Sequence, residues 1–220
     1  MSSEDHVSTA RAVYDVAAGT YVQFAGTEIN SATEHPIDRS LLEAFIELIK
    51  SQTVGRVADV GCGPGRVASL MADRGLNVLG VDVSPAMLAI ASAAHPHIDF
   101  VEGQLDALPI ESGGLAGAAC WYSIIYTPRS RLVEAFDELA RVLIPGGQLL
   151  LAFQAEGEPL RREDAFGSGL PLTSYRHSVS DVVGRLEESG FRISTTVIRA
   201  PELEHETTAQ GFVVASGPHS

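Results

Sequence analysis

The sequence predicts an α/β protein built on a doubly wound seven-stranded sheet, mostly parallel, with an antiparallel strand near the C-terminus and a helical lid at the N-terminus. From about residue 40, short apolar runs alternate with helix-like stretches, as in a parallel sheet with helices on both faces. A glycine-rich turn, "GCGPG" (61–65), follows the first of these runs. The last two apolar runs follow each other directly, which predicts an antiparallel pair.

Each element has a local signal. Apolar residues repeat at helical spacing in "LLEAFIELIK" (41–50), Ser84 and Pro85 mark a helix start, and Gly75 and Gly190 mark helix ends. The expected helices are 41–50, 66–75, 84–95, 130–143 and 178–190. The expected strands are 56–61, 77–83, 98–103, 115–123, 147–154, 191–200 and 208–217.

Length and composition favour one domain. The chain has 220 residues, of which 45% are hydrophobic, enough for one ordinary core and compatible with a single domain over 1–220. Two segments lie outside the regular alternation. We expect 1–40 to form an N-terminal lid and 155–178 to form an insertion that also covers a ligand site.

Charge and composition narrow the classes of partner. The net charge of −13 makes a nucleic-acid partner unfavourable, because such a surface repels phosphates. The two cysteines have no metal-ligand spacing, so no metal is expected. No leader pattern or membrane-crossing run is present, and the sequence predicts a soluble, cytoplasmic protein with no membrane partner. It leaves the oligomeric state open between monomer and homodimer.

The glycine-rich turn and a following acid predict a nucleoside site. Glycines at a strand-to-helix turn let a ligand approach the backbone, although such turns also serve helix packing. Asp82 ends the second strand about twenty residues later, where an acid binds ribose hydroxyls. The NAD fingerprint would require a third glycine where Arg66 stands, and Asp59 would repel a pyrophosphate. The pattern therefore favours a positively charged nucleoside.

At this point the sequence resembles the class I S-adenosylmethionine-dependent methyltransferases, within their small-molecule branch of quinone and natural-product enzymes. The residues that carry the resemblance are "VADVGCGPGRVA" (57–68), "LGVDVSPAMLAIA" (79–91), "FVEGQLDALPI" (100–110), "AACWYSIIYTP" (118–128) and "ELARVLIPGGQLLLAF" (138–153). The resemblance implies a Rossmann-like fold, S-adenosylmethionine as cofactor and S-adenosylhomocysteine as its product.

The resemblance also implies roles for individual residues. Asp59 and the glycine loop would contact the methionine part of the cofactor, and Asp82 would bind the ribose. Val83 and Met87 would flank the adenine ring, with packing in the core as the alternative for these two. Gln104 stands where the family usually has an acid at the adenine amino group. "YDVAAGTY" (14–21) resembles the family's N-terminal segment, and plain helix packing is the alternative there. The expected cofactor-binding residues are Tyr14, Tyr21, Asp59, Gly61, Cys62, Gly63, Asp82, Val83, Met87, Gln104, Leu105 and Trp121.

The acceptor side is less well marked. Tyr126 stands where many relatives carry a histidine base, so Tyr126 and His177 are the expected catalytic residues, with His177 in solvent near Ser178 as the alternative. The expected acceptor-binding residues are Tyr122, Tyr126, Tyr175 and Arg176. Core packing of the aromatic residues and a surface ion pair for Arg176 are the competing interpretations.

Three functions compete at this level. The first is methyl transfer by in-line displacement to oxygen, nitrogen or carbon of a small-molecule acceptor. The second is a cofactor-binding protein of the same fold without transfer activity, with a regulatory or assembly role. The third, an NAD-dependent oxidoreductase, is disfavoured by the glycine spacing.

Overall fold

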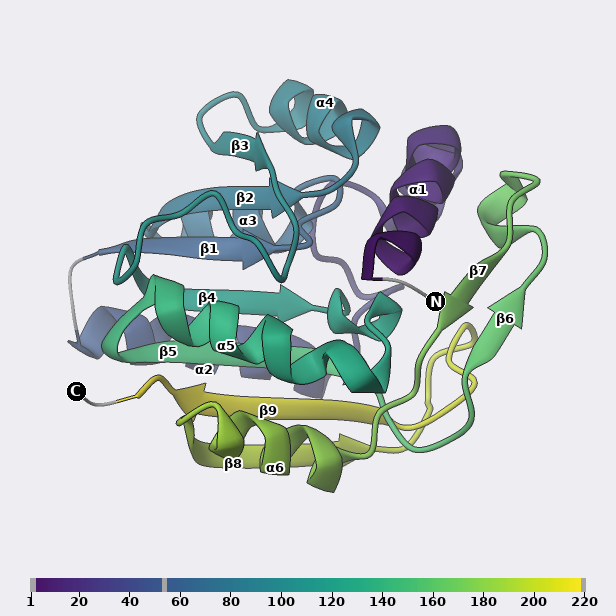
Figure 1. Ribbon diagram of the computed structural model, residues 1–220. Coiled ribbons are helices and arrows are strands. Elements are labelled where there is room, and N and C mark those ends of the chain that lie inside the picture. The colour runs from purple at the N-terminus through teal and green to yellow at the C-terminus, as the bar shows by residue number, and fades with distance from the viewer. Residues whose placement is uncertain (1–2, 53–54, 219–220) are drawn as a thin grey trace.

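The computed structural model describes residues 3–52 and 55–218, in which seven strands form one mixed sheet (Figure 1). The strand order is β3-β2-β1-β4-β5-β9-β8, and β9 runs antiparallel to both of its neighbours. The strands are β1 (Arg56–Val60), β2 (Asn77–Asp82), β3 (Asp99–Glu102), β4 (Leu115–Trp121), β5 (Leu143–Gln154), β8 (Arg192–Arg199) and β9 (Gln210–Ser216). The Rossmann-like prediction is confirmed. Residues 1–2 of the expected lid, and 53–54 and 219–220 of the expected domain, lie outside the described residues.

Helices cover both faces of the sheet. Alternate residues of a strand point to opposite faces, so Leu149, Leu151 and Phe153 of β5 pack towards α5 (Leu132–Val142) and α6 (Val179–Glu188). Leu150 and Ala152 pack towards α2 and α3. Those helices are α2 (Pro36–Gln52) and α3 (Arg66–Asp73), while α4 (Pro85–Ala94) packs against β3 at the sheet edge. Burial on both faces explains why the central strands are almost wholly apolar.

Two segments lie over the carboxyl ends of the parallel strands (Figure 1). One is helix α1 (Ser3–Ala25). The other is the hairpin of β6 (Leu160–Arg162) and β7 (Leu172–Ser174), whose tip contains the short 3₁₀ helix η3 (Ala165–Gly167). Contacts between α1 and η3 join the two segments, which are far apart in the sequence. The hairpin lies within the expected insertion, 155–178.

The boundaries differ from the sequence prediction in two places. Helix α2 begins at Pro36 rather than at residue 41, because proline suits the first helical position, so the helix starts inside the segment expected to form the lid. Strand β5 begins at Leu143 rather than at 147, because Leu143 pairs with Leu115 before a bulge interrupts the register. The other elements agree within about three residues.

None of the helices in the described part of the chain has both the length and the apolar character needed to cross a membrane. Within the same residues, no cluster of three or more histidine, cysteine or acidic side chains is arranged to hold a metal ion. Cys62 and Cys120 are both buried, free thiols.

Candidate functional site

A cavity of about 610 Å³ lies at the carboxyl ends of β1, β2, β4 and β5, beneath α1 and the β6–β7 hairpin. The volume is that of a small-ligand site, and the position is where doubly wound sheets bind ligands. The cavity brings together these residues expected from the sequence: Tyr14, Tyr21, Gly61, Gly63, Asp82, Val83, Met87, Leu105, Trp121, Tyr122 and Tyr126.

The three glycines of the 61–65 turn all have positive φ, and their surroundings differ. A Cβ on Gly61 would lie 2.3 Å from the Cβ of Ser123, so this glycine allows the turn to pack against the end of β4. A Cβ on Gly65 would lie 3.0 Å from the His95 ring. A Cβ on Gly63 would meet no atom within 4 Å, although Gly63 lines the cavity. Only Gly63 therefore faces space that a ligand can fill.

We expect Gly63→Val and Gly61→Ala to fail in different ways. Gly63→Val places methyl groups in the open cavity, so S-adenosylhomocysteine binding should be abolished, with a modest loss of stability from the strained φ of 51°. Gly61→Ala should lower the free energy of unfolding by about 2 kcal/mol or more, because the added carbon overlaps Ser123. Calorimetric titration and urea unfolding of both variants separate these effects. Unimpaired binding by a folded Gly63→Val variant would contradict the assignment.

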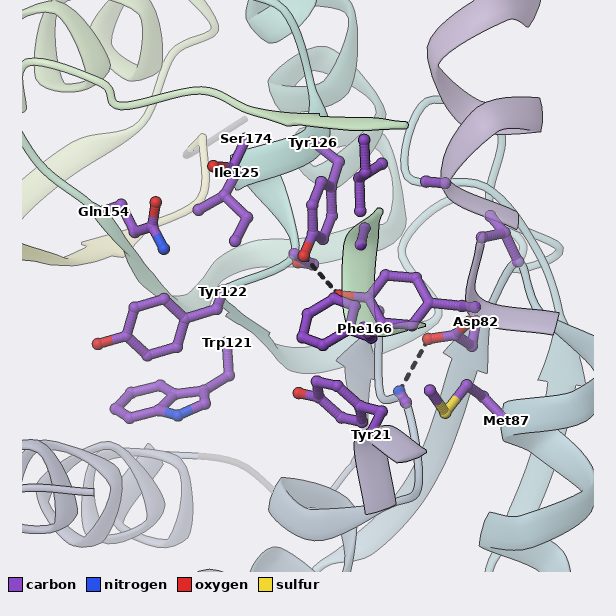
Figure 2. A pocket seen from close by; sticks show the side chains of 18 of the residues that line it. Tyr21, Asp82, Met87, Trp121, Tyr122, Ile125, Tyr126, Gln154, Phe166 and Ser174 are labelled. Carbon is purple, nitrogen blue, oxygen red and sulfur yellow. Dashed lines mark hydrogen bonds between the residues drawn. The ribbon is translucent and has the colours of Figure 1, made fainter. Parts of the chain in front are cut away.

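Asp82 holds the loop and faces the cavity at the end of β2. Its Oδ2 accepts a hydrogen bond from the Gly63 amide at 2.8 Å (Figure 2). Its Oδ1 accepts one from the Ser84 amide at 2.9 Å. Burial raises the pKa of this carboxyl, and the backbone amides counteract part of that rise. Each oxygen retains a lone pair for a further donor, as two neighbouring ribose hydroxyls would supply.

The adenine end of the expected site is formed by α4 and the 103–106 turn. Ser84 caps α4 as predicted, with its Oγ accepting a bond from the Met87 amide at 3.2 Å, and Met87 and Val83 line the cavity. Gln104 is exposed and does not line it, whereas Leu105 and Asp106 do. The acid thus stands two residues beyond the position that the family pattern indicates, and sequence analysis missed it.

Asp59 and Cys62 do not reach the cavity wall. The carboxylate of Asp59 is 1% exposed and accepts a bond from the Ala68 amide at 2.9 Å, inside helix α3. Burial raises the pKa of Asp59 to about 7 despite that bond. Burial also raises the pKa of the Cys62 thiol well above its usual range, which leaves it a structural side chain.

Asp59 should make stability depend on pH. Because its pKa is raised in the folded state, the folded protein binds this proton more tightly than the unfolded chain. The contribution of Asp59 to the free energy of unfolding is complete below about pH 4. It is lost as the pH rises to about 7, by up to about 1.4 kcal/mol per pH unit. Asp59→Asn should therefore be more stable than the parent at pH 8, with a smaller difference at pH 5.5. Urea unfolding at both pH values measures this, and a pH-independent difference would contradict it.

Four aromatic rings join α1 to the hairpin and to the segment after β4. Tyr14 packs edge-on against Tyr21 with ring centroids 5.5 Å apart, and Phe166 of η3 packs against both. The hydroxyl groups of Tyr14 and Tyr126 share a hydrogen bond of 2.5 Å (Figure 2). Burial raises the pKa of Tyr126, more than the bond from Tyr14 lowers it. Tyr126 consequently keeps its proton at neutral pH.

An ion pair closes the cavity beside the glycine loop. Arg66, where the NAD fingerprint would have glycine, donates to Glu34 and, at 2.7 Å, to the hydroxyl of Thr33. The side chains of Arg66 and Glu34 are 11% and 3% exposed, and both line the cavity. The pair ties the 27–35 segment to the start of α3. In the sequence, Arg66 indicated only that the loop does not bind a dinucleotide, and its place in the cavity lining was missed.

The structure does not bring Tyr175, Arg176 and His177 to the cavity. His177 is 3% exposed, neither in solvent nor in the cavity, and its Nε2 bonds the Ile124 carbonyl at 3.2 Å. Burial lowers its pKa. Arg176 donates to the hydroxyl of Thr207 at 3.0 Å, and Tyr175 stacks on His177. These three residues pack against neighbouring loops outside the cavity. They therefore supply neither the expected catalytic base nor the expected contacts to the acceptor.

The ends of β4 and β5 form the opposite part of the cavity. Trp121, Tyr122 and Gln154 line it there and lie across the view in Figure 2 from Asp82 and Met87. Trp121 is 7% exposed, and Tyr122 adopts a φ of 60°. Gln154 is the polar residue that ends the apolar run of β5, and sequence analysis did not single it out.

Comparison with known proteins agrees with this geometry. Residues 57–147 match the family model described as "Methyltransferase domain", a stretch that runs from the strand before the glycine loop to the bulge of β5. Over this stretch the chain is a methyltransferase domain of the class I S-adenosylmethionine-dependent type. The match supports S-adenosylmethionine as the cofactor.

Individual relatives of this family differ in how much they share with the chain. It is 27% identical over 205 residues to a demethylmenaquinone methyltransferase of Chlorobaculum tepidum, covering 90% of this chain and 80% of that protein. It is 30% identical over 113 residues to a malonyl-[acyl-carrier protein] O-methyltransferase of Enterobacter lignolyticus, covering 51% of this chain but only 44% of that protein. Among solved structures, the magnesium protoporphyrin IX methyltransferase of Synechocystis PCC 6803 with bound SAM has a TM-score of 0.68 at 17% identity, with 97% of each chain covered.

Proposed function

We propose that the protein transfers the methyl group of S-adenosylmethionine to a small-molecule acceptor, at oxygen, nitrogen or carbon. The observation that carries the proposal is one cavity with two unlike ends. Asp82, bonded to the loop amides, lies at one end, and the aromatic and amide side chains of β4 and β5 lie at the other. Relatives named for acting on demethylmenaquinone and magnesium protoporphyrin IX support a small-molecule acceptor.

The residues at the Asp82 end fit the cofactor. Asp82 has free lone pairs for the ribose hydroxyls, and Gly63 faces open space beside them. Met87 and Val83 offer apolar surfaces to the adenine ring, and Asp106 replaces Gln104 as the acceptor for its amino group. We assign Asp59 no direct contact, because Ala68 already occupies its carboxylate within the core.

The lining around the loop fits the methionine part. Arg66 brings a guanidinium to the cavity, suited to the carboxylate, and Tyr14 and Tyr21 bring aromatic edges and hydroxyl groups. When bound, the cofactor would supply a methyl carbon on a positively charged sulfur. A lone pair or carbanion of the acceptor would attack that carbon in line, and the carbon–sulfur bonding electrons would leave with the sulfur of S-adenosylhomocysteine.

The protein's own part is to align the acceptor and to exclude water. Tyr126 keeps its proton at neutral pH, so it positions ligands by hydrogen bonding and does not act as a base. Where the acceptor atom carries a proton, that proton must pass to water or to another group at the cavity. His205, at the exposed mouth, lines the cavity and touches Phe24 of α1.

The test has two stages. Titration calorimetry first measures binding of S-adenosylhomocysteine, and mass spectrometry then screens neutral phenols, quinols, amines and carboxylic acids for methylated products. We expect binding and at least one methylated product. Binding without any methylated product would favour the alternative, a cofactor-binding protein without transfer activity; absence of binding would contradict both.

A further inference from the structure

Two polar side-chain atoms at the β4–β5 end of the cavity are buried without a partner. The indole Nε1 of Trp121 and the Oε1 of Gln154 have no hydrogen-bond partner among the described residues. Trp121 is 7% exposed, and both Trp121 and Gln154 line the cavity. A buried donor or acceptor without a partner is costly, so these atoms are suited to a ligand that supplies the complementary groups.

The backbone at this end carries strain. Tyr122 has a φ of 60°, which is unfavourable for an aromatic residue, and its amide donates to the Ala152 carbonyl at 2.9 Å. This conformation ends β4 and leaves the Tyr122 ring in the cavity wall, with its centroid 5.7 Å from that of Trp121. Strain of this kind gathers at ligand sites. The two rings give this end flat aromatic surfaces.

The nearby buried cation is fully occupied. Arg199 is 3% exposed and uses all five N–H groups: two bond Asp38, two bond Glu206, and one bonds the Ala200 carbonyl. Burial alone would raise the pKa of Glu206, but the bonds from Arg199 and two backbone amides lower it to about 2. Glu206 lines the cavity as a carboxylate, so the cluster carries one net negative charge and offers no donor to an anion.

We propose that Trp121, Tyr122 and Gln154 form the acceptor subsite, and that it takes an uncharged, planar molecule carrying an oxygen that accepts a hydrogen bond. Both atoms have almost no accessible surface in the unliganded protein, so on binding the two side chains rotate towards the cavity. The oxygen then pairs with the Trp121 N–H, a hydroxyl or ring N–H pairs with Gln154, and the flat rings pack on the molecule. An anionic acceptor would be desolvated here beside the Glu206 carboxylate. The arginines that line the cavity lie on other elements: Arg66 is paired with Glu34, and Arg162 is on strand β6. This proposal rests on the proposed function, because it calls the ligand of the subsite the acceptor. It also assigns Trp121 to the acceptor rather than to the cofactor.

The chain offers a direct probe, because Trp121 is its only tryptophan. In a ¹⁵N-labelled sample saturated with S-adenosylhomocysteine, a single side-chain indole N–H resonance reports this subsite. The probes are two matched pairs: coumarin with coumarin-3-carboxylate, and 2-naphthol with 2-naphthoate. We expect at least one neutral probe to bind and to move the indole proton downfield, and its carboxylate partner to bind at least about tenfold more weakly.

Two variants locate the contact. Gln154→Leu removes the amide at similar size, and the affinity for 2-naphthol should fall about tenfold by calorimetry. Gln148→Leu is the matched control: it changes the same residue type on the same strand, at the end away from the cavity, and should leave that affinity unchanged. Both variants should bind S-adenosylhomocysteine like the parent.

The proposal is overturned if no neutral probe binds, if one binds without moving the indole resonance, if the carboxylates bind equally well, or if Gln154→Leu has no effect. Turnover is read separately, with S-adenosylmethionine in place of the product. A probe that binds at Trp121 without being methylated leaves the subsite standing and counts against methyl transfer. Methylation of a probe that does not move the indole resonance supports transfer and overturns the subsite.

Discussion

Replacing Asp82 by alanine should weaken S-adenosylhomocysteine binding by about 2–4 kcal/mol, measured by titration calorimetry. The variant loses a carboxylate able to accept both ribose hydroxyls in charge-assisted bonds. It also frees the amides of Gly63 and Ser84, which Asp82 holds at 2.8 and 2.9 Å, so the glycine loop loses its anchor. The effect combines a lost ligand contact with a less ordered site.

The matching control is Asp99→Ala, an exposed acid on the neighbouring strand β3 that pairs with Arg56 at 2.6 Å. Surface pairs of this kind contribute little, so affinity and thermal unfolding should both stay near the parent values. Thermal unfolding of the Asp82 variant establishes that it is folded. Unchanged affinity in a folded Asp82→Ala protein would remove Asp82 from the cofactor site.

Removing residues 1–22 should leave a folded core with weaker cofactor binding and little or no turnover. The deletion takes away Tyr14 and Tyr21 from the cavity wall. It also takes away Asp15, whose carboxylate accepts a bond from the Ser84 hydroxyl at 2.6 Å. Helix α1 otherwise contributes few residues to the main core, so the sheet should fold without it. Calorimetry and a product assay measure both losses.

If α1 and the 155–178 segment form a lid over the cavity, both should become ordered when ligand binds. In hydrogen exchange, the α1 and 155–178 segments should exchange quickly in the free protein and become protected with S-adenosylhomocysteine. Strands β1 and β2, each paired with a strand on both sides, should be protected throughout.

A point variant tests how α1 is held over the cavity. Tyr14→Phe removes the 2.5 Å bond to Tyr126, in the segment after β4, and should reduce the protection of α1, whereas Val16→Ala, at a 64% exposed site on the same helix, should not. If the truncated protein turned over normally, or if neither segment gained protection, α1 and the hairpin would be ordinary surface elements.

The sequence by itself determined the sheet, the glycine loop and most of the residues that line the Asp82 end of the cavity. Those features depend on local patterns: apolar strands, a cap at Ser84, and glycines followed by Asp82 within one βαβ unit. Local geometry places such residues together whatever the rest of the chain does. Aromatic residues Tyr14 and Tyr21 were also found, because they belong to a recognisable segment on one helix.

Only the tertiary structure decided which remaining side chains face the cavity. Gln154 is a single polar residue at the end of an apolar strand, and Phe166 lies in a polar insertion. Both line the cavity because distant segments pack over the strand ends. His177 looked reactive in the sequence, yet its backbone pairs with the end of β5 and its ring is buried against Ile124. Asp59 was expected to meet the methionine part of the cofactor. Its carboxylate instead accepts a hydrogen bond from the Ala68 amide and does not line the cavity. Long-range packing sets the direction of a side chain at a strand end, and no local pattern encodes it.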